Sequence, residues 1–170
     1  MTHAERIAEL TTAFNESMAR ILARLDAVSP EQLTTKPEGG GWSAAEVAWH
    51  VGVINEAFAG LIDGSIPKAR PAPEGFVETP WSNIASLVPA TLDAPAQFHP
   101  PAGVAAGDAL AKLRSSQQRM VDALASLEES RSGLTVKSTL GTPINLYQVG
   151  NWAAAHVARH NAQIKRALGV

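Results

Sequence analysis

Four stretches of the sequence carry apolar residues at spacings of three and four, and this periodicity constrains the fold more than any other feature. They are residues 4–28, 43–63, 106–128 and 143–168. Apolar residues at such spacings form one stripe along an α-helix, and each stripe has to be buried against another element. No segment shows the strict alternation of a half-buried strand. The pattern therefore predicts an all-α fold, a four-helix bundle without a sheet.

The predicted second helix has the clearest start signal of the chain. Ser43 is followed three residues later by Glu46, the spacing of a capping box in which each side chain satisfies the other residue's backbone N–H. Gly64 is placed to end this helix. For the fourth helix, the pair Thr142–Pro143 predicts the start, because proline is tolerated at the first helical position.

A proline-rich connection separates the second and third predicted helices. It covers residues 65–103, which is long for a loop in a compact domain. We expect it to wrap around the bundle, with one short helix within residues 79–87 that uses Thr79 as its cap and Pro80 as its first residue. Another short helix is predicted at residues 29–33. Three apolar residues of the connection need cover from the bundle or from a second copy in a homodimer: Phe76, Trp81 and Phe98.

Length, charge and cysteine content restrict the class of protein. The 170 residues predict a single domain over residues 1–170. The net charge of -2 argues against a nucleic acid or an anionic membrane as partner, because both require a basic surface. There is no cysteine, which excludes disulfides, thiolate metal sites and a cysteine nucleophile. The N-terminal residues do not resemble a signal peptide and no stretch is apolar enough to span a membrane, so we expect a cytoplasmic protein.

Three of the five histidines fall on the predicted core-facing stripes. His50 takes the place of an apolar residue in the second helix, and His156 and His160 do so in the fourth, four residues apart. Side chains at this spacing project side by side, so both imidazoles can bind one metal ion. A lone histidine on an apolar face is usually a hydrogen-bonded core residue, but burying three neutral imidazoles without partners is costly. Together they predict a divalent metal site between facing helices.

The depth of these histidines predicts the relative direction of their helices. At a rise of about 1.5 Å per residue, His50 lies about 10 Å from the start of its helix and His160 about 12 Å from the end of the other. These positions are level only if the second and fourth helices are antiparallel. In a parallel pair, His156 would lie about 20 Å along its helix and would miss His50 by two turns.

Three segments of the chain resemble the DinB/YfiT superfamily. They are GWSAAEVAWHV, with its Trp-Ser-x-x-Glu-x-x-x-His shape, then FHPPAGV before the third helix, and HVARHNAQI in the fourth. The resemblance spans nearly the whole chain. It implies a DinB-type bundle with up-up-down-down topology in which three histidines bind a divalent metal, and it favours the homodimer. Carried over to this sequence, the ligands are His50, His156 and His160, and all three positions match.

Three imidazole ligands leave a divalent ion an open coordination position, as in catalytic rather than structural sites. Imidazole suits Zn, Ni and Fe alike, so the metal is not specified. Two neighbours are candidates for binding a cofactor. Trp152 lies one turn before His156 and either walls the site or only packs in the core, and Gln163 can orient a ligand or a bound water. Glu46 is better explained by the capping box than as a base, and no catalytic residue is assigned.

The predicted activity depends on the resemblance and on what the site lacks. No carboxylate stands beside the paired histidines, where Val157 and Ala162 are found, so a resident base is not supported. The resemblance implies metal-dependent transferases and isomerases that use low-molecular-weight thiols, and a metal-bound thiolate needs no base. We therefore predict a metal-dependent enzyme acting on a small-molecule substrate, as a thiol-dependent transferase or a hydrolase. The alternative is a non-catalytic metal-binding or small-ligand-binding protein with a role in stress.

Overall fold

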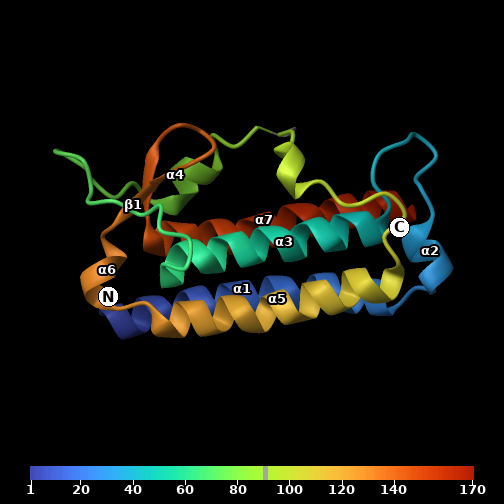
Figure 1. The fold of residues 1–170 in the computed structure, drawn as a ribbon, viewed down its shortest axis with the longest axis horizontal. Coiled ribbons are helices and arrows are strands. Elements are labelled where there is room, and N and C mark those ends of the chain that lie inside the picture. Colours follow the sequence, from blue (N-terminus) through green and yellow to red (C-terminus); the bar gives the residue numbers. More distant parts are fainter. Residues whose placement is uncertain (90–91) are drawn as a thin grey trace.

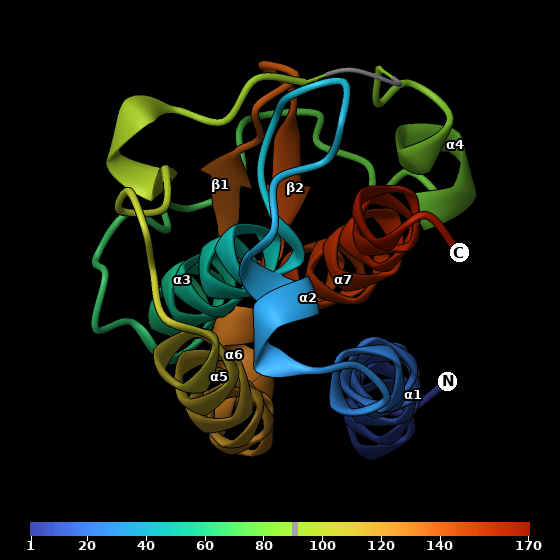
Figure 2. The same cartoon turned by 90° about the vertical axis from the view of Figure 1, so that its right-hand side faces the viewer.

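The computed structural model describes residues 1–89 and 92–170 and is mostly helical. Four long helices lie side by side (Figure 1): α1 (His3–Asp26), α3 (Ala44–Asp63), α5 (Ala106–Ser126) and α7 (Leu146–Leu168). Viewed along their axes, they occupy the four corners of a bundle (Figure 2). The predicted helical class is confirmed, and each predicted long helix is present with ends shifted by a few residues.

Short elements connect the long helices: α2 (Pro30–Thr34), α4 (Trp81–Ala85), the 3-10 helix η1 (Ala96–Phe98), α6 (Glu129–Ser132), β1 (Thr135–Lys137) and β2 (Pro143–Asn145). The short helix predicted within residues 79–87 is α4, but Thr79 is not its cap. The helix starts after Pro80 without a side-chain cap, and the Thr79 carbonyl instead accepts a hydrogen bond from Gln148 of α7. Positions 90 and 91 of the predicted connection lie outside the described residues.

The directions of the helices differ from the predicted up-up-down-down order. α1 and α7 run one way, and α3 and α5 run the other way (Figure 1). Side-chain contacts also show that α3 and α5 run in the same direction. Asn55 bonds to Ser116, and further along both helices Asp63 pairs with Arg119. The short connection through α2 reverses the chain after α1. The long connection after α3 returns the chain along the bundle, so that α5 can start at the same end as α3. The predicted antiparallel arrangement of α3 and α7 is confirmed.

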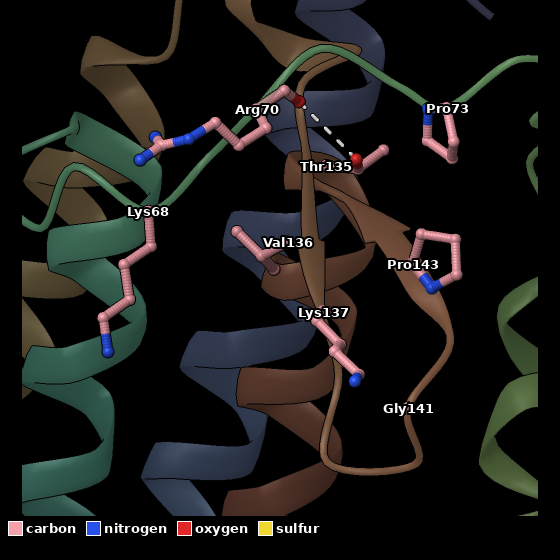
Figure 3. A pocket seen from close by; sticks show the side chains of 8 residues that line it. All are labelled: Lys68, Arg70, Pro73, Thr135, Val136, Lys137, Gly141 and Pro143. Carbon is pink, nitrogen blue, oxygen red and sulfur yellow. Dashed lines mark hydrogen bonds between the residues drawn. The ribbon is translucent and has the colours of Figure 1, made fainter.

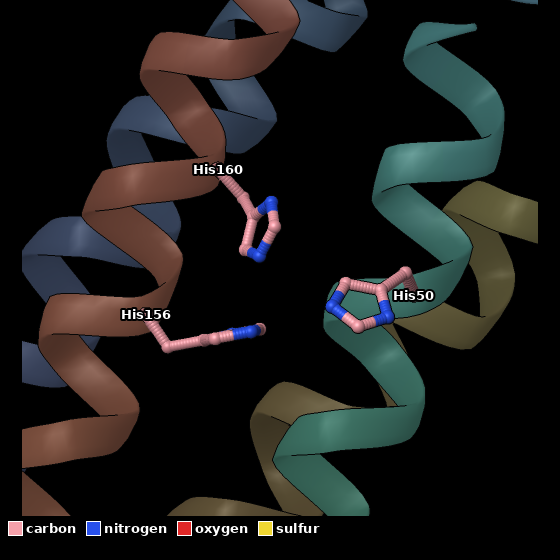
Figure 4. A group of neighbouring side chains, drawn as sticks. All are labelled: His50, His156 and His160. Carbon is pink, nitrogen blue, oxygen red and sulfur yellow. The ribbon is translucent and has the colours of Figure 1, made fainter. Parts of the chain in front are cut away.

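The core lies between the four long helices. Fully buried side chains include Phe14 and Met18 of α1 and Leu113 of α5. On α7 the fully buried positions include Ala153, Val157 and Ile164. The histidines of α7 were predicted on this core stripe, but they lie beside it and face α3 instead (Figure 4).

A two-stranded antiparallel hairpin between α6 and α7 contradicts the prediction that the fold has no sheet. Val136 of β1 pairs with Ile144 of β2, and both side chains are buried. β1 also pairs with the backbone of Arg70 in the connection after α3. Strands of three residues are too short to show a period of two, which is why the sequence pattern missed them. A groove of about 400 Å³ opens beside the hairpin, lined in part by Lys68 and Lys137 (Figure 3).

The hairpin also explains why α7 starts later than predicted. Pro143 belongs to β2, so Thr142–Pro143 is not a helix start. The N-cap is Asn145, whose side chain accepts from the backbone N–H of Gln148 at 2.9 Å. The Gln148 side chain accepts in return from the backbone N–H of Asn145 at 2.9 Å. This is a capping box, and the spacing Asn-x-x-Gln is the signal that would have located the helix start.

Of the apolar residues in the connection after α3, Trp81 finds cover on the bundle, whereas Val77, Leu87 and Leu92 stay exposed. Trp81 packs against Trp152 of α7 with ring centroids 5.7 Å apart, and Phe76 and Phe98 are half-buried. The homodimer therefore stays a prediction. Within the described residues, no helix is both long enough and apolar enough to cross a membrane.

Candidate metal centre

The three predicted histidines meet in the space between α3 and α7 (Figure 4). The ring centroid of His50 lies 5.3 Å from that of His156 and 4.9 Å from that of His160. The two rings on α7 are 4.3 Å apart. One possible ligand atom from each histidine lies within 4.8 Å of the other two. The antiparallel packing thus brings together a group of nitrogen atoms that one ion can contact, and we call these three residues the histidine triad.

The capping box of α3 fixes the position of His50 along the bundle. Ser43 Oγ accepts from the backbone N–H of Glu46 at 3.2 Å, and Glu46 Oε2 accepts from the backbone N–H of Ser43 at 2.8 Å. Lys36 Nζ also lies 2.6 Å from Glu46 Oε2. Burial raises the pKa of Glu46, but Lys36 and Ser43 outweigh it, and the net shift is downward. Glu46 is therefore an ionised structural group rather than a base for the triad.

His50 is held by a backbone group from a distant part of the chain. Its side chain is 2% exposed, and its Nδ1 lies 2.8 Å from the carbonyl oxygen of Phe98. A carbonyl only accepts, so Nδ1–H is the donor and Nε2 carries the free lone pair. Outer hydrogen bonds of this kind fix the tautomer and the orientation of histidine ligands in metal sites. Side-chain identity gives no signal for a backbone carbonyl, and the sequence analysis did not find it.

His160 is held by a neighbour on its own helix. Its Nδ1 lies 2.6 Å from Oε1 of Gln163, one turn further along α7. The amide oxygen accepts, so Nδ1–H donates and Nε2 is again the nitrogen left for a ligand bond. The sequence analysis placed Gln163 as a residue that orients a ligand, and the hydrogen bond to His160 fits that role.

His156 lacks such a partner. Its Nδ1 is buried and has no hydrogen-bond partner among the described residues. Leaving a buried polar nitrogen unpaired costs about 1–3 kcal/mol. A cation bound at this nitrogen would remove that cost, because the Nδ1 lone pair would then form the bond to the ion. The unpaired nitrogen, next to two correctly oriented neighbours, fits a metal ion better than it fits a site without one.

Burial lowers the pKa of every histidine in the triad. For His50, burial outweighs the opposing effect of the Phe98 carbonyl. Burial and the repulsion of a charged His50 lower the pKa of His160 to about 4. The pKa of His156 is well below its ordinary value because of burial and then the repulsion of His160 and His50. All three rings are neutral at pH 7, which is the form that binds metals.

Aromatic rings surround the triad on the α3 side. The Trp42 ring lies 5.0 Å from that of His50 and 5.5 Å from that of His99. Phe58 meets His156 edge-on with centroids 6.1 Å apart. His50 is therefore contacted by Trp42, the residue before the cap of α3, and by the connection that precedes α5, in addition to the two histidines of α7.

The predicted cofactor-binding residue Trp152 contacts the connection after α3. Its side chain is 8% exposed, and its ring lies against that of Trp81 of α4 in a tilted arrangement. One turn beyond His156, Arg159 donates to the carbonyl oxygen of Pro89 at 2.7 Å. These residues on α7 hold the long connection against the bundle. Whether Trp152 also contacts a cofactor stays a prediction.

All candidate metal ligands at this site are of one kind. Among the described residues, the group consists of three imidazoles and includes no carboxylate. Two grooves lie near the hairpin and the end of α3, and neither is lined by a triad histidine. Chemically, the triad can hold a divalent cation through three neutral nitrogens.

Comparison with known proteins agrees with this geometry. A family model described as the DinB superfamily matches residues 13–164, a range that contains α3, α5 and the triad. No curated protein matches the chain.

Proposed function

The chain belongs to the DinB superfamily, as the resemblance of its sequence predicted, and on this basis we propose that it is a metal-dependent enzyme. Its three histidines hold one divalent ion, Zn, Ni or Fe, and its substrate is a small molecule. The observation that carries the proposal is the buried, unpaired Nδ1 of His156 within a cluster of neutral imidazoles.

The residues of the triad supply neutral ligands in fixed orientations. The Phe98 carbonyl orients His50, and Gln163 orients His160. The aromatic rings of Trp42 and Phe58 stand beside the ligands and limit the access of water to their outer faces. When bound, a divalent ion with three such ligands keeps an open position and lowers the pKa of a bound water or thiol.

Thiol-dependent transfer is the reaction class that this donor set favours. A hydrolase of the usual kind needs a general base within hydrogen-bond reach of the attacking water. The described triad includes no carboxylate, and Glu46 is engaged by Ser43 and Lys36. A thiol substrate reacts as the thiolate and needs no such residue. We therefore place a transferase that uses a low-molecular-weight thiol before a hydrolase.

A non-catalytic metal-binding protein is the second candidate, and one observation favours it. The connection after α3 lies against His50, whose side chain is only 2% exposed. A site covered in this way suits retention of a metal or a small ligand better than rapid exchange of substrate. A role in stress would belong to this second candidate.

Metal analysis followed by a thiol-dependent activity screen separates the candidates. The purified protein is loaded with Zn, Ni or Fe, its metal content is measured, and transfer from electrophilic substrates is followed with a panel of low-molecular-weight thiols. One equivalent of metal and thiol-dependent turnover, both lost in His156→Ala, supports the enzyme. One equivalent of metal without turnover supports the non-catalytic protein. A protein that binds none of the three ions rejects both.

A further inference from the structure

The connection between α3 and α5, residues 65–89 and 92–105, is here called the crossover segment. Among the described residues, three side chains of the long helices donate to backbone carbonyls of this segment. Gln148 of α7 donates to Thr79 at 2.7 Å, and Arg159 of α7 donates to Pro89 at 2.7 Å. The third donor is His50 of α3, to Phe98 at 2.8 Å. Of these three bonds, the first two along the chain come from α7, and the last comes from a triad histidine of α3.

The Phe98 carbonyl is presented by a short hydrogen-bonded turn, which we call the Phe98 turn (residues 94–99). The backbone N–H of Phe98 donates to the carbonyl of Pro95 at 2.9 Å, and that of His99 donates to Ala96 at 3.1 Å. The His99 ring closes the turn, with Nε2 2.8 Å from the carbonyl of Ala94. These bonds fix the direction of the carbonyl that His50 contacts.

Trp42 links the Phe98 turn to His50 a second time. Its ring contacts His50 on one side and His99 of the turn on the other, at 5.0 Å and 5.5 Å between centroids. His50 is thus held by a hydrogen bond at Nδ1 and by an aromatic contact on its ring. Both contacts depend on the turn or on a residue packed against it.

We propose that the Phe98 turn is a positioning element for the metal centre, and that order in this turn and metal affinity are coupled. This inference rests on the proposed metal site. While the turn is formed, its carbonyl holds the His50 proton on Nδ1 and leaves Nε2 for the ion. When the turn opens, the ring is free to change tautomer and orientation, and the third ligand is lost. Coupling of this kind is reciprocal, so a bound ion also stabilises the turn.

The crossover segment contains a matched control. Pro73 starts another turn closed by a backbone bond over three residues, in which the N–H of Phe76 donates to the Pro73 carbonyl at 3.0 Å. That turn bears no bond to the triad among the described residues. Replacing either proline by glycine gives the chain the same added freedom, but only Pro95 belongs to the turn that holds His50.

The experiment measures zinc affinity and amide hydrogen exchange in the wild type, Pro95→Gly and Pro73→Gly. We expect Pro95→Gly to keep one zinc site per chain with about 10-fold lower affinity, the size usual for loss of an outer hydrogen-bond partner. Pro73→Gly should bind zinc as the wild type does. In the wild type, zinc should slow exchange of the Phe98 and His99 amides and leave that of Phe76 unchanged.

Two results would overturn the coupling: wild-type zinc affinity in Pro95→Gly, or exchange of the Phe98 and His99 amides that zinc does not alter. If Pro95→Gly does not fold, the exchange measurement on the wild type decides alone. If the wild type binds no zinc, nickel or iron, the proposed function itself is rejected. If it binds metal but the affinity does not depend on the Phe98 turn, only the coupling is rejected.

Discussion

The two helices that build the triad prepare their histidines differently. α3 contributes only His50, whose outer nitrogen is bonded to the Phe98 carbonyl. α7 contributes two, of which His160 is oriented by Gln163 while the Nδ1 of His156 has no partner among the described residues. Two ligands are thus oriented before a metal arrives, and the third carries the unsatisfied group. The difference indicates that His156 gains the most from a bound ion, whereas His50 is also part of the fold.

The largest expected effect is the loss of a ligand from either helix. His50→Ala removes the only triad ligand from α3, and His156→Ala removes the chelating pair of α7. Each should abolish tight binding of zinc or nickel, a loss well beyond the 10–100-fold typical of outer-shell changes. Competition against a chelator of known affinity measures this. His3→Ala is the control, because His3 lies outside the triad and contacts Tyr147. If His50→Ala keeps wild-type stoichiometry and affinity, the site is not shared between helices.

Without metal, lowering the pH should reduce the free energy of unfolding, because the buried triad histidines take up protons less readily than they do in the unfolded chain. The folded-state pKa of His160 is about 4, against an ordinary value of 6.5, so the unfolded chain takes up the proton first. Stability is therefore retained above about pH 6.5 and lost as the pH falls toward 4, by up to about 1.4 kcal/mol per pH unit and ~3 kcal/mol in total for this residue. Urea unfolding between pH 7.5 and pH 4 measures the slope. An equal slope in His160→Leu would show that the residue does not contribute.

In the absence of metal, replacing a triad histidine by leucine should change the free energy of unfolding differently on α7 and on α3. His156→Leu removes the unpaired nitrogen, so the free energy of unfolding should stay constant or rise by about 1 kcal/mol. His50→Leu leaves the Phe98 carbonyl without its donor and should cost about 1–3 kcal/mol. Chemical unfolding of both variants in a chelating buffer tests the contrast. Equal destabilisation by the two replacements would remove the distinction between the helices.

The smallest expected effect concerns Gln163. Gln163→Leu removes the acceptor for the Nδ1–H of His160 and should lower metal affinity by roughly 10-fold without changing the stoichiometry. Gln163→Glu keeps an acceptor and adds negative charge, so its affinity should equal or exceed that of the wild type. Calorimetric titration with zinc compares the two. A loss of affinity in Gln163→Glu as large as that in Gln163→Leu would mean that the residue acts only through packing.

The histidines of the site could be predicted, whereas the aromatic side chains of Trp42 and Phe58 and the backbone carbonyl of Phe98 could not. His50, His156 and His160 were visible because histidine on an apolar stripe is a conspicuous residue type. Phe98 supplies only its carbonyl, which every residue has, so its role depends on where the crossover segment passes. The hairpin could not be predicted either, because strands of three residues are too short to show the alternation of apolar and polar residues.

The predicted order of helix directions came from the family resemblance and was wrong, and the periodicity of the apolar stripes could not correct it because a stripe does not state which neighbour covers it. Connection lengths carry that information. Residues 27–43 are few enough to reverse the chain beside α1, and the crossover segment is long enough to return the chain along the bundle. Read in this way, the sequence supports antiparallel α1 and α3 and parallel α3 and α5. The position of α7 against both α1 and α3 follows only from the packed structure.

The pairing of α1 with α7 has a consequence for synthesis of the protein on the ribosome. The main packing partner of α1 is the last helix of the chain, which starts at Leu146, whereas α1 ends at Asp26. At about 5–20 residues per second, the intervening chain takes roughly 6–24 s to make. During this time the apolar stripe of α1, with Phe14, Met18 and Ile21, lacks its final cover. Until α7 has been made, this stripe is an apolar surface of the kind that chaperones recognise on nascent chains.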